Sequence, residues 1–221
     1  MPNGTLEALT IRPAGAIAPL RVDAVLALAG TGLAQDRHAD PRSPRQLLLA
    51  GRQIYERLAL PPHALRENLL VDLDTAQLAS GTVLQVGPEV SIRLMFACEA
   101  CGRLDLQRPG LAGRVGAQRG MLARVVQGGT MRVGDAIRVL GGQMPPWPDD
   151  WRERVAQVLD VVPEGFVVAY RDLARLAGIQ STYCRAFPRL LARLGPGYAG
   201  KAVAAGASPD LPRWDGAGLY E

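Results

Sequence analysis

The 221-residue chain has little lysine, few cysteines and few aromatic residues. Lys201 is the only lysine, so arginine carries almost all of the positive charge, and the formal net charge is +4. Guanidinium groups are forked donors suited to phosphate and carboxylate, so this mild basic bias permits anion binding. Three cysteines are an odd number and too few for a disulfide framework, which predicts a reducing, cytoplasmic location.

Long apolar runs are also missing. No stretch approaches the roughly 18 apolar residues of a membrane span, and residues 1–30 lack the basic start and apolar run of a signal peptide. We therefore expect no membrane partner. A hydrophobic content of 48% with 21% charged residues is typical of a globular protein, and the length allows one large domain or two small ones.

The first part of the chain, up to about residue 140, consists of short apolar or alternating runs separated by Gly, Pro and Asp, the pattern of β-strands. Only residues 51–60 have helical spacing, with Ile54, Leu58 and Tyr55 on one face. Many short strands with so little helix predict a β-barrel or sandwich. The strand-like runs are LEALTIR, APLRVDAVLAL, RQLLLA, NLLVDLD, TVLQVG, VSIRLMF, MLARVVQGG and DAIRVL.

The pattern changes after a Gly- and Pro-rich segment, 142–149, which we interpret as a linker. Asp150 followed by Glu153 is a capping-box pattern, and apolar residues then recur at helical spacing. We therefore expect a β domain over 1–141 and a small, mostly helical domain over 150–221.

Several polar residues of the first domain are candidates for binding a ligand. Asp36, Arg37 and His38 lie in a glycine-flanked turn, where a loop can present polar groups to a ligand, or where it can simply be solvated. Arg45 and Arg66 suit a phosphate or carboxylate, although each arginine alone is more often an ordinary surface residue. Arg66, Glu67 and Asn68 directly precede an apolar strand, where an ion pair or a strand cap is the alternative to a binding role.

Two of the three cysteines, Cys98 and Cys101, lie in the stretch MFACEACGRLD. A zinc site would need a second ligand pair, and the sequence has none. A redox CxxC normally begins a helix, and the residues after Cys101 do not predict one. The remaining alternatives are two buried cysteines or a thiolate stabilised by Arg103 and other arginines, and we favour the thiolate because it is the form that attacks or carries sulfur.

Five motifs of the first domain occur in an order that resembles the MOSC (molybdenum cofactor sulfurase C-terminal) family over residues 5–140. They are GLAQDRHAD, RQLLLA, LRENLLVDLDTAQLASGTVLQVG, CEACGRLD and RGMLARVVQGGTMRVGDAIRV. The resemblance implies a β-barrel with Cys101 at the reactive position, where it would ligate molybdenum or hold a persulfide. Cys98 is a second thiol that the family pattern does not require.

The same resemblance implies the molybdenum cofactor, a molybdopterin, as the bound group. It also implies a sulfur-carrier role or the reduction of N-hydroxylated bases. The chain has no pyridoxal-phosphate sulfurase domain and no cysteine cluster for an iron–sulfur centre, so a redox or sulfur-donor protein would be a partner. The residues expected to hold the cofactor are Asp36, Arg37, His38, Arg45, Arg66, Asn68 and Arg103.

The second domain, through VAQVLDVVPEGFVVAYRDLARLAG and CRAFPRLL, resembles the DNA-binding domain of alkylguanine-DNA alkyltransferases and alkyltransferase-like proteins. This implies a winged helix-turn-helix and a duplex DNA partner, with Tyr170 and Arg185 helping to rotate a base out of the duplex. Arg189 and Arg193 follow Arg185 at spacings of four, so we expect one basic helical face that contacts phosphates.

Two departures from this second family matter. The acceptor motif of the family falls near residues 198–201, where no cysteine is present, so alkyl transfer is excluded. Pro188 is predicted to lie inside the recognition helix and to kink it. The alternative is therefore a domain that binds a protein partner or damaged DNA without catalysis, with the first domain as a scaffold.

Overall fold

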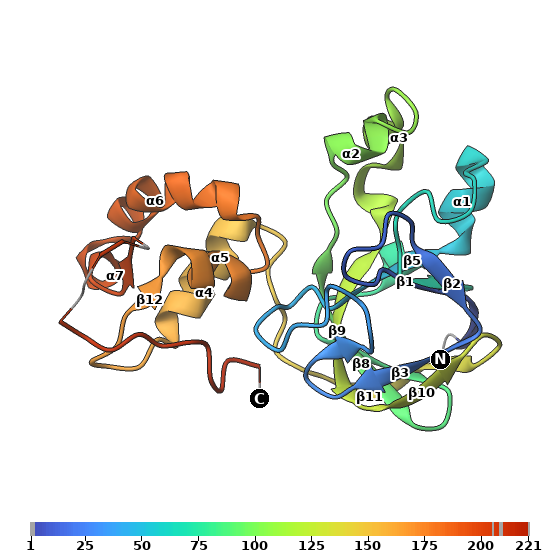
Figure 1. Ribbon diagram of the computed structural model, residues 1–221, viewed down its shortest axis with the longest axis horizontal. Helices are drawn as coiled ribbons and strands as arrows, with labels where there is room; N and C mark the ends of the chain where they lie inside the picture. Colours follow the sequence, from blue (N-terminus) through green and yellow to red (C-terminus); the bar gives the residue numbers. More distant parts are fainter. Residues whose placement is uncertain (1–2, 205, 208–209, 221) are drawn as a thin grey trace. The chain divides into compact units, whose positions relative to one another are not determined.

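The computed structural model describes residues 3–204, 206–207 and 210–220, and it divides into two compact units (Figure 1). The first unit ends at Trp147, and the second contains the short segment Arg42–Pro44 together with the chain from Pro148 onwards. Trp147 is buried, and its backbone N–H donates to Ser80 Oγ at 2.7 Å. The chain therefore leaves the first unit at Pro148, within the segment predicted to be a linker.

The first unit is a closed seven-stranded barrel, which confirms the predicted β-barrel with few helices. The strand order is β11-β7-β8-β9-β5-β6-β1, and β1 pairs with β11 to close the ring, while β2 extends the sheet beside β1. These strands are β1 (Asn3–Ile11), β2 (Leu20–Val22), β5 (Leu47–Gly51), β6 (Leu69–Val71), β7 (Thr82–Val86), β8 (Val90–Ala97), β9 (Met121–Gln127) and β11 (Ala136–Gln143). A separate sheet has the order β10-β3-β4, with β3 (Ala24–Leu28), β4 (Gly32–Leu33) and β10 (Gly129–Arg132).

The interior of the barrel is filled by aliphatic side chains from alternating positions. In β7, for example, buried and half-buried residues alternate along TVLQV, as expected for a strand with one face toward a core. Leu6, Leu49, Leu69, Leu84 and Leu94 are all fully buried in the same cluster. Burial of such side chains contributes about 1.5–3 kcal/mol each relative to exposure, so this cluster is the main source of stability in the first unit.

One pair of neighbouring barrel strands, β5 and β6, is parallel, and this pair requires a crossover. The crossover contains α1 (Arg52–Leu58), which confirms the helix predicted over residues 51–60, with its Ile54, Tyr55 and Leu58 buried. These residues belong to a second apolar cluster that also holds Leu104 of α2 (Gly102–Asp105) and two residues of α3 (Leu111–Val115). The short helices beside the cysteines are thus anchored to the crossover. Two 3₁₀ segments, η1 (Thr75–Gln77) and η2 (Gly116–Arg119), complete this unit.

The second unit is mostly helical. Asp150 caps α4 by accepting from Arg152 N at 2.7 Å, and Val155, Val158 and Leu159 of the predicted apolar face are buried. β12 and β13 form a short parallel pair; in the chain, β12 lies between α4 and α5, and β13 follows α7. The elements are α4 (Trp151–Asp160), β12 (Val168–Ala169), α5 (Tyr170–Leu176), η3 (Ser181–Ala186), α6 (Phe187–Leu194), α7 (Pro196–Ala199) and β13 (Ala202–Val203).

The arginine-rich stretch of the second unit differs from its prediction. It is not one helix, because the 3₁₀ segment η3 precedes α6 and contains Arg185, whereas Arg189 and Arg193 lie on α6. Pro188 occupies the first turn of α6, where a missing N–H leaves no helical hydrogen bond unmade. The predicted kink at Pro188 is therefore wrong. The winged-helix arrangement stays a prediction.

Candidate functional site

Cys101 lies between the end of β8 and the start of α2. Its backbone is extended, and α2 begins at the next residue, Gly102. The prediction that no helix follows Cys101 is thus wrong, because Leu104, which is fully buried, fixes a single helical turn onto the second apolar cluster. That turn directs the backbone N–H of Arg103 to the thiol, where it forms a hydrogen bond.

Arg119, which the sequence analysis missed, is the closest charged partner of Cys101. Its guanidinium is buried and donates to Cys101 Sγ at 3.3 Å and to the carbonyl of Glu99 at 2.5 Å. Partial burial alone would raise the pKa of Cys101, but the N–H of Arg103 and the charge of Arg119 outweigh it and hold that pKa below its ordinary value. For the more deeply buried Cys98, burial dominates and raises the pKa. Cys101 is therefore the thiol that ionises more readily.

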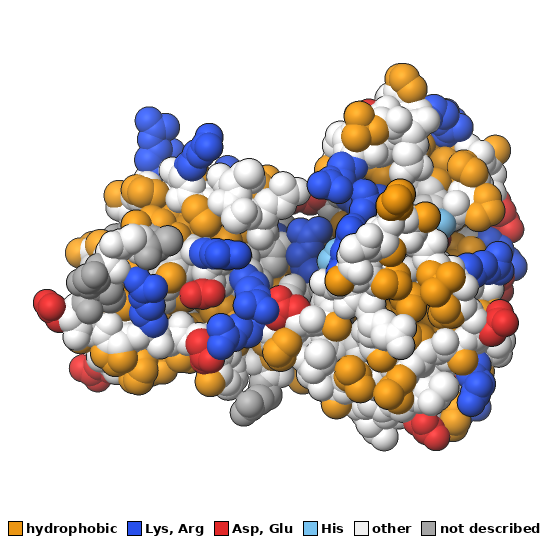
Figure 2. All heavy atoms as spheres, viewed as in Figure 1, with side chains coloured by type: hydrophobic (Ala, Val, Ile, Leu, Met, Phe, Trp, Pro, Cys, Tyr) orange, Lys and Arg blue, Asp and Glu red, His pale blue; other side chains and the backbone are white. Residues whose placement is uncertain are grey.

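Three arginines, Arg66, Arg103 and Arg119, interact electrostatically with this thiol, and Arg37 interacts with Arg66. Burial lowers the pKa of Arg66, and the nearby charges of Arg103, Arg37 and Arg119 lower it further, while Cys101 acts in the opposite sense. In the space-filling view, Arg side chains gather on the first unit below the α2 and α3 projection, with a His beside them (Figure 2). Like charges held this close favour a bound anion, because each repels the others until an anion compensates them.

The buried carboxylate of Asp36 holds the turn that carries Arg37 in place. Asp36 accepts from the backbone N–H of Arg12 at 2.8 Å, from Asn68 Nδ2 at 2.9 Å and from the backbone N–H of His38 at 2.8 Å. Burial alone would raise the pKa of Asp36, but the hydrogen bond with His38 Nδ1, at 2.9 Å, and those from the backbone N–H groups of His38 and Arg12 hold it below its ordinary value. The side-chain oxygen of Asn68 also accepts from Leu48 N, and its Nδ2 donates to the Thr10 carbonyl. Both Asp36 and Asn68 are buried, so the structure places them as supports of the turn that carries Arg37.

Arg12 is the second residue that the sequence analysis missed. Its guanidinium donates to the carbonyl of Arg66 and lies 3.4 Å from His38 Nδ1. Arg66 has a φ of 62°, in the left-handed region that a residue with a side chain rarely adopts, so the contact with Arg12 fixes an otherwise unfavourable turn. Arg45 is half-buried, and its charge acts on Cys98, in the loop that carries Cys101.

Three of these arginines, Arg12, Arg37 and Arg66, line a cavity of about 390 Å³, whereas Cys101, Arg103 and Arg119 are not among its lining residues. Its polar wall contains Arg12, Arg37, Arg66 and His63, and its other wall is the apolar loop 16–19, in which Ile17 is fully exposed. The cavity is of the size that small-molecule ligands occupy, which is about 300–1,000 Å³. It combines cations that can hold a phosphate with an apolar surface that can face a ring.

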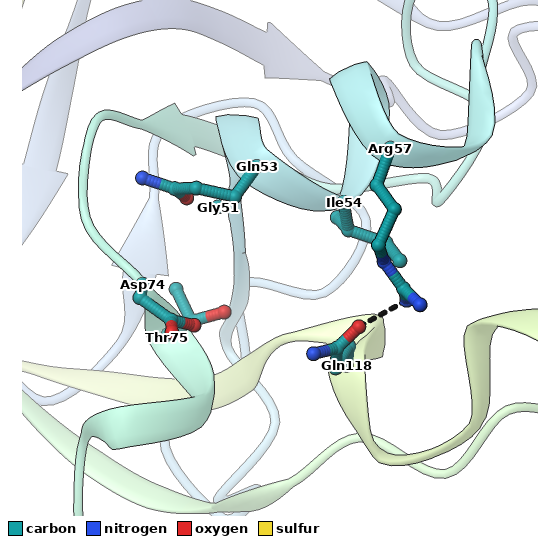
Figure 3. Close-up of a pocket in the computed structure, with 7 residues that line it drawn as sticks. All are labelled: Gly51, Gln53, Ile54, Arg57, Asp74, Thr75 and Gln118. Carbon is teal, nitrogen blue, oxygen red and sulfur yellow. Dashed lines mark hydrogen bonds between the residues drawn. The ribbon is translucent and has the colours of Figure 1, made fainter.

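A second hollow, of about 100 Å³, lies between α1 and the segments around residues 74 and 118 (Figure 3). In it, Arg57 of α1 donates to the side-chain oxygen of Gln118, and Gln53, Asp74 and Thr75 line the remaining wall. Its volume is below the range that small-molecule ligands occupy. The larger cavity is therefore the candidate site.

A family model matches the part of the first unit that holds the thiol and three of its arginines. Residues 45–138 match the model of the MOSC domain family. This chain contains a MOSC domain. Comparison with curated proteins gave no match. The matched range includes Cys101, Arg66, Arg103 and Arg119, whereas Arg12 and the turn 36–38 precede it.

Solved structures share the fold of this chain. The YuaD protein from Bacillus subtilis is 18% identical with a TM-score of 0.53, and the alignment covers 62% of this chain and 96% of that one. YiiM from Geobacillus stearothermophilus is 13% identical with a TM-score of 0.52, covering 85% and 99%. A protein described as hypothetical is 19% identical with a TM-score of 0.55, covering 87% and 90%. The last two alignments cover more of the chain than the first unit holds, so they extend beyond the MOSC unit.

The alternative sites find less support. Within the described residues no group of three or more His, Cys, Asp and Glu side chains is placed to hold a metal ion, which leaves the CxxC pair without further zinc ligands. None of the described helices has the length and apolar character needed to cross a membrane.

The residues predicted to contact DNA lie on the second unit. Tyr170, the first residue of α5, is half-buried, and its ring meets the buried Phe187 edge-on with centroids 5.4 Å apart. Arg185, Arg189 and Arg193 are all exposed. Figure 2 shows basic side chains that project from the region of α6.

Proposed function

We propose that the MOSC unit binds the molybdenum cofactor and uses Cys101 as the thiolate that ligates molybdenum or carries sulfur. The observation that supports this most directly is the hydrogen bond from Arg119 to Cys101 Sγ, at 3.3 Å. Arg66, which interacts electrostatically with this thiol, also lines the cation-rich cavity. A thiolate is a soft ligand and a strong nucleophile, so the same group suits a thiophilic metal or a persulfide.

The residues present fit a pterin that bears a phosphate. Arg12, Arg37 and Arg66 line the cavity and can hold the phosphate as forked donors. The apolar loop 16–19 faces the same space and can cover the ring system. When bound, the cofactor supplies the metal centre for atom transfer, including the reduction of N-hydroxylated bases, and a partner protein supplies electrons or sulfur. Arg119 and the backbone N–H of Arg103 favour the thiolate form of Cys101.

The test is to express the full chain in a host that makes the cofactor and to measure molybdenum, pterin and cyanide-labile sulfur in the purified protein. We expect the wild type to contain pterin and either metal or labile sulfur. The Cys101→Ser variant should lose the metal or the sulfur, whereas Cys184→Ser, which alters a thiol of the second unit, should retain them. A wild-type protein with none of the three would contradict the proposal.

A paired arginine experiment tests the cavity itself. We expect Arg66→Ala to lower pterin content about tenfold, since a charge-assisted hydrogen bond to phosphate contributes about 1.5–3 kcal/mol. Arg57→Ala removes an arginine from the smaller hollow and should leave the content unchanged. Equal pterin content in the two variants would place the cofactor elsewhere.

For the second unit we propose binding to the phosphate backbone of duplex DNA without alkyl transfer. The exposed Arg189 and Arg193 on α6, with Arg185 just before them, support this proposal. We expect affinity to fall steeply with salt, and the double variant Arg189→Ala/Arg193→Ala to reduce the slope of log K against log salt by about 2. Arg152→Ala removes an exposed arginine of α4 and should leave that slope unchanged. A wild-type chain without affinity for duplex DNA would leave this unit as a partner-binding tail.

A further inference from the structure

Cys98 has no role in the proposed function, yet it is anchored to Gly120, the residue next to the Arg119 that holds Cys101. The backbone N–H of Cys98 donates to the carbonyl of Gly120 at 2.8 Å. The adjacent Arg119 donates to the carbonyl of Glu99 and to Cys101 Sγ. Arg119 and Gly120, which directly precede β9, therefore fix the loop that carries both thiols. They hold it at Cys98, Glu99 and Cys101.

The two thiols also interact electrostatically. A negative charge on Cys101 opposes ionisation of Cys98, and the Arg119 guanidinium acts on both sulfur atoms. Cys98 is 3% exposed, whereas Cys101 is partly open to solvent. One thiol is thus accessible to an incoming reagent, while the other, three residues earlier in the same loop, is shielded from solvent.

We propose that Cys98 is the resolving thiol that discharges sulfur from Cys101 by forming a Cys98–Cys101 disulfide. This inference rests on the sulfur-carrier form of the proposed function. Cys101 first holds an outer sulfur atom as a persulfide. Cys98 loses its proton and attacks Cys101 Sγ, the new S–S bond forms, and the bond to the outer sulfur breaks. The outer sulfur leaves with that electron pair as hydrosulfide.

The reaction balances without an oxidant, because the persulfide already holds the oxidised sulfur. One persulfide and one thiol give one disulfide and one hydrosulfide. Two electrons and two protons from a dithiol reductant then restore both cysteines. Burial suits Cys98 to this role, since a shielded thiol does not compete with Cys101 for the incoming sulfur. The arginines beside Cys101 can hold the departing anion near an acceptor.

The experiment uses the full chain, reduced and then loaded with inorganic polysulfide. After removal of excess reagent, released hydrosulfide is measured over time, and the cysteine peptides are mapped by mass spectrometry without reduction. We expect the wild type to release hydrosulfide without added thiol and to accumulate a Cys98–Cys101 disulfide. We expect Cys98→Ala to keep the extra sulfur on Cys101 and to release hydrosulfide at least about tenfold more slowly, since intramolecular attack is lost.

Cys184→Ala serves as the control that removes a remote thiol, and it should behave as the wild type does. Peptide mapping of the wild-type chain needs no variant, so the inference stays testable if Cys98→Ala fails to fold. Sulfur uptake followed by release at the same rate without Cys98 would overturn this inference alone, as would the absence of the disulfide in the wild type. A wild-type chain in which Cys101 never takes up sulfur would overturn the sulfur-carrier function as well.

Discussion

Replacing Arg119 with methionine is expected to slow the alkylation of Cys101 by iodoacetamide near neutral pH by about tenfold for each unit by which the thiol pKa rises. Arg119 donates to Cys101 Sγ at 3.3 Å and is itself buried, so its charge acts on the thiolate with little screening by water. Without it, the hydrogen bond from the backbone of Arg103 remains, but partial burial, which raises the pKa, is no longer outweighed to the same extent.

The measurement is the pH profile of the alkylation rate, resolved by peptide so that each cysteine is followed separately. The midpoint of the Cys101 profile should move to higher pH in Arg119→Met. Arg119→Lys keeps the positive charge but loses the forked guanidinium, so its midpoint should fall between those of the wild type and Arg119→Met. Arg57→Met, which removes the exposed arginine of the smaller hollow, is the control. A profile for Cys101 that is unchanged in Arg119→Met would mean that this guanidinium does not set its ionisation.

Replacing Asp36 with alanine is expected to lower the free energy of unfolding of the first unit by about 3–5 kcal/mol. The variant leaves the donors of Arg12, His38 and Asn68 without the carboxylate that they share. A carboxylate whose folded pKa lies below the ordinary 3.8 stabilises the fold above that value. Its contribution disappears as the pH falls through the lower, folded pKa. The difference in the free energy of unfolding between wild type and variant should thus be at its maximum at pH 5 and disappear only below about pH 4.

Hydrogen exchange of peptides from β5 and β6 measures this effect within the first unit, because Leu48 N and Asn68 belong to the same network. Asp74→Ala is the matched control. Asp74 is exposed and accepts one hydrogen bond, from Ala76 N at 3.1 Å, so its loss should cost about 1 kcal/mol or less. Equal protection in wild type and Asp36→Ala would show that the carboxylate is dispensable. A gap that grew as the pH fell would contradict the direction of its pKa shift.

Much of the fold could be predicted because its strands satisfy local rules. Runs such as TVLQV alternate between buried and half-buried positions, and residues 51–60 have the spacing of the helix that forms there. The failures have identifiable causes as well. The four-residue helix after Cys101 depends on one buried leucine that packs against a distant cluster. The arginine-rich stretch of the second unit begins as a 3₁₀ segment, so Pro188 falls in the first turn of α6.

The candidate site was harder to predict because its parts are distant in sequence. Cys101, Arg66 and Arg103 could be proposed from motifs. Arg12 and Arg119 could not, because no motif distinguishes them from the other arginines. Their positions follow from the barrel: Arg12 comes directly after β1, and Arg119 directly precedes Gly120 and β9. Only pairing of these strands with their neighbours brings Arg119 to the thiol and Arg12 to Arg66.

The pairing of the first strand with the last has a consequence during synthesis. Residues 3–5 of β1 bond to residues 136–138 of β11, so the ring can close only after nearly the whole first unit has been translated. At cellular rates of about 5–20 residues per second, that delay is on the order of 10 s. Until then, the edge of β1 lacks this partner and is open to strand pairing with other chains. We therefore expect newly synthesised chains to need a chaperone until β11 pairs with β1, and any cofactor to bind only after the ring has closed.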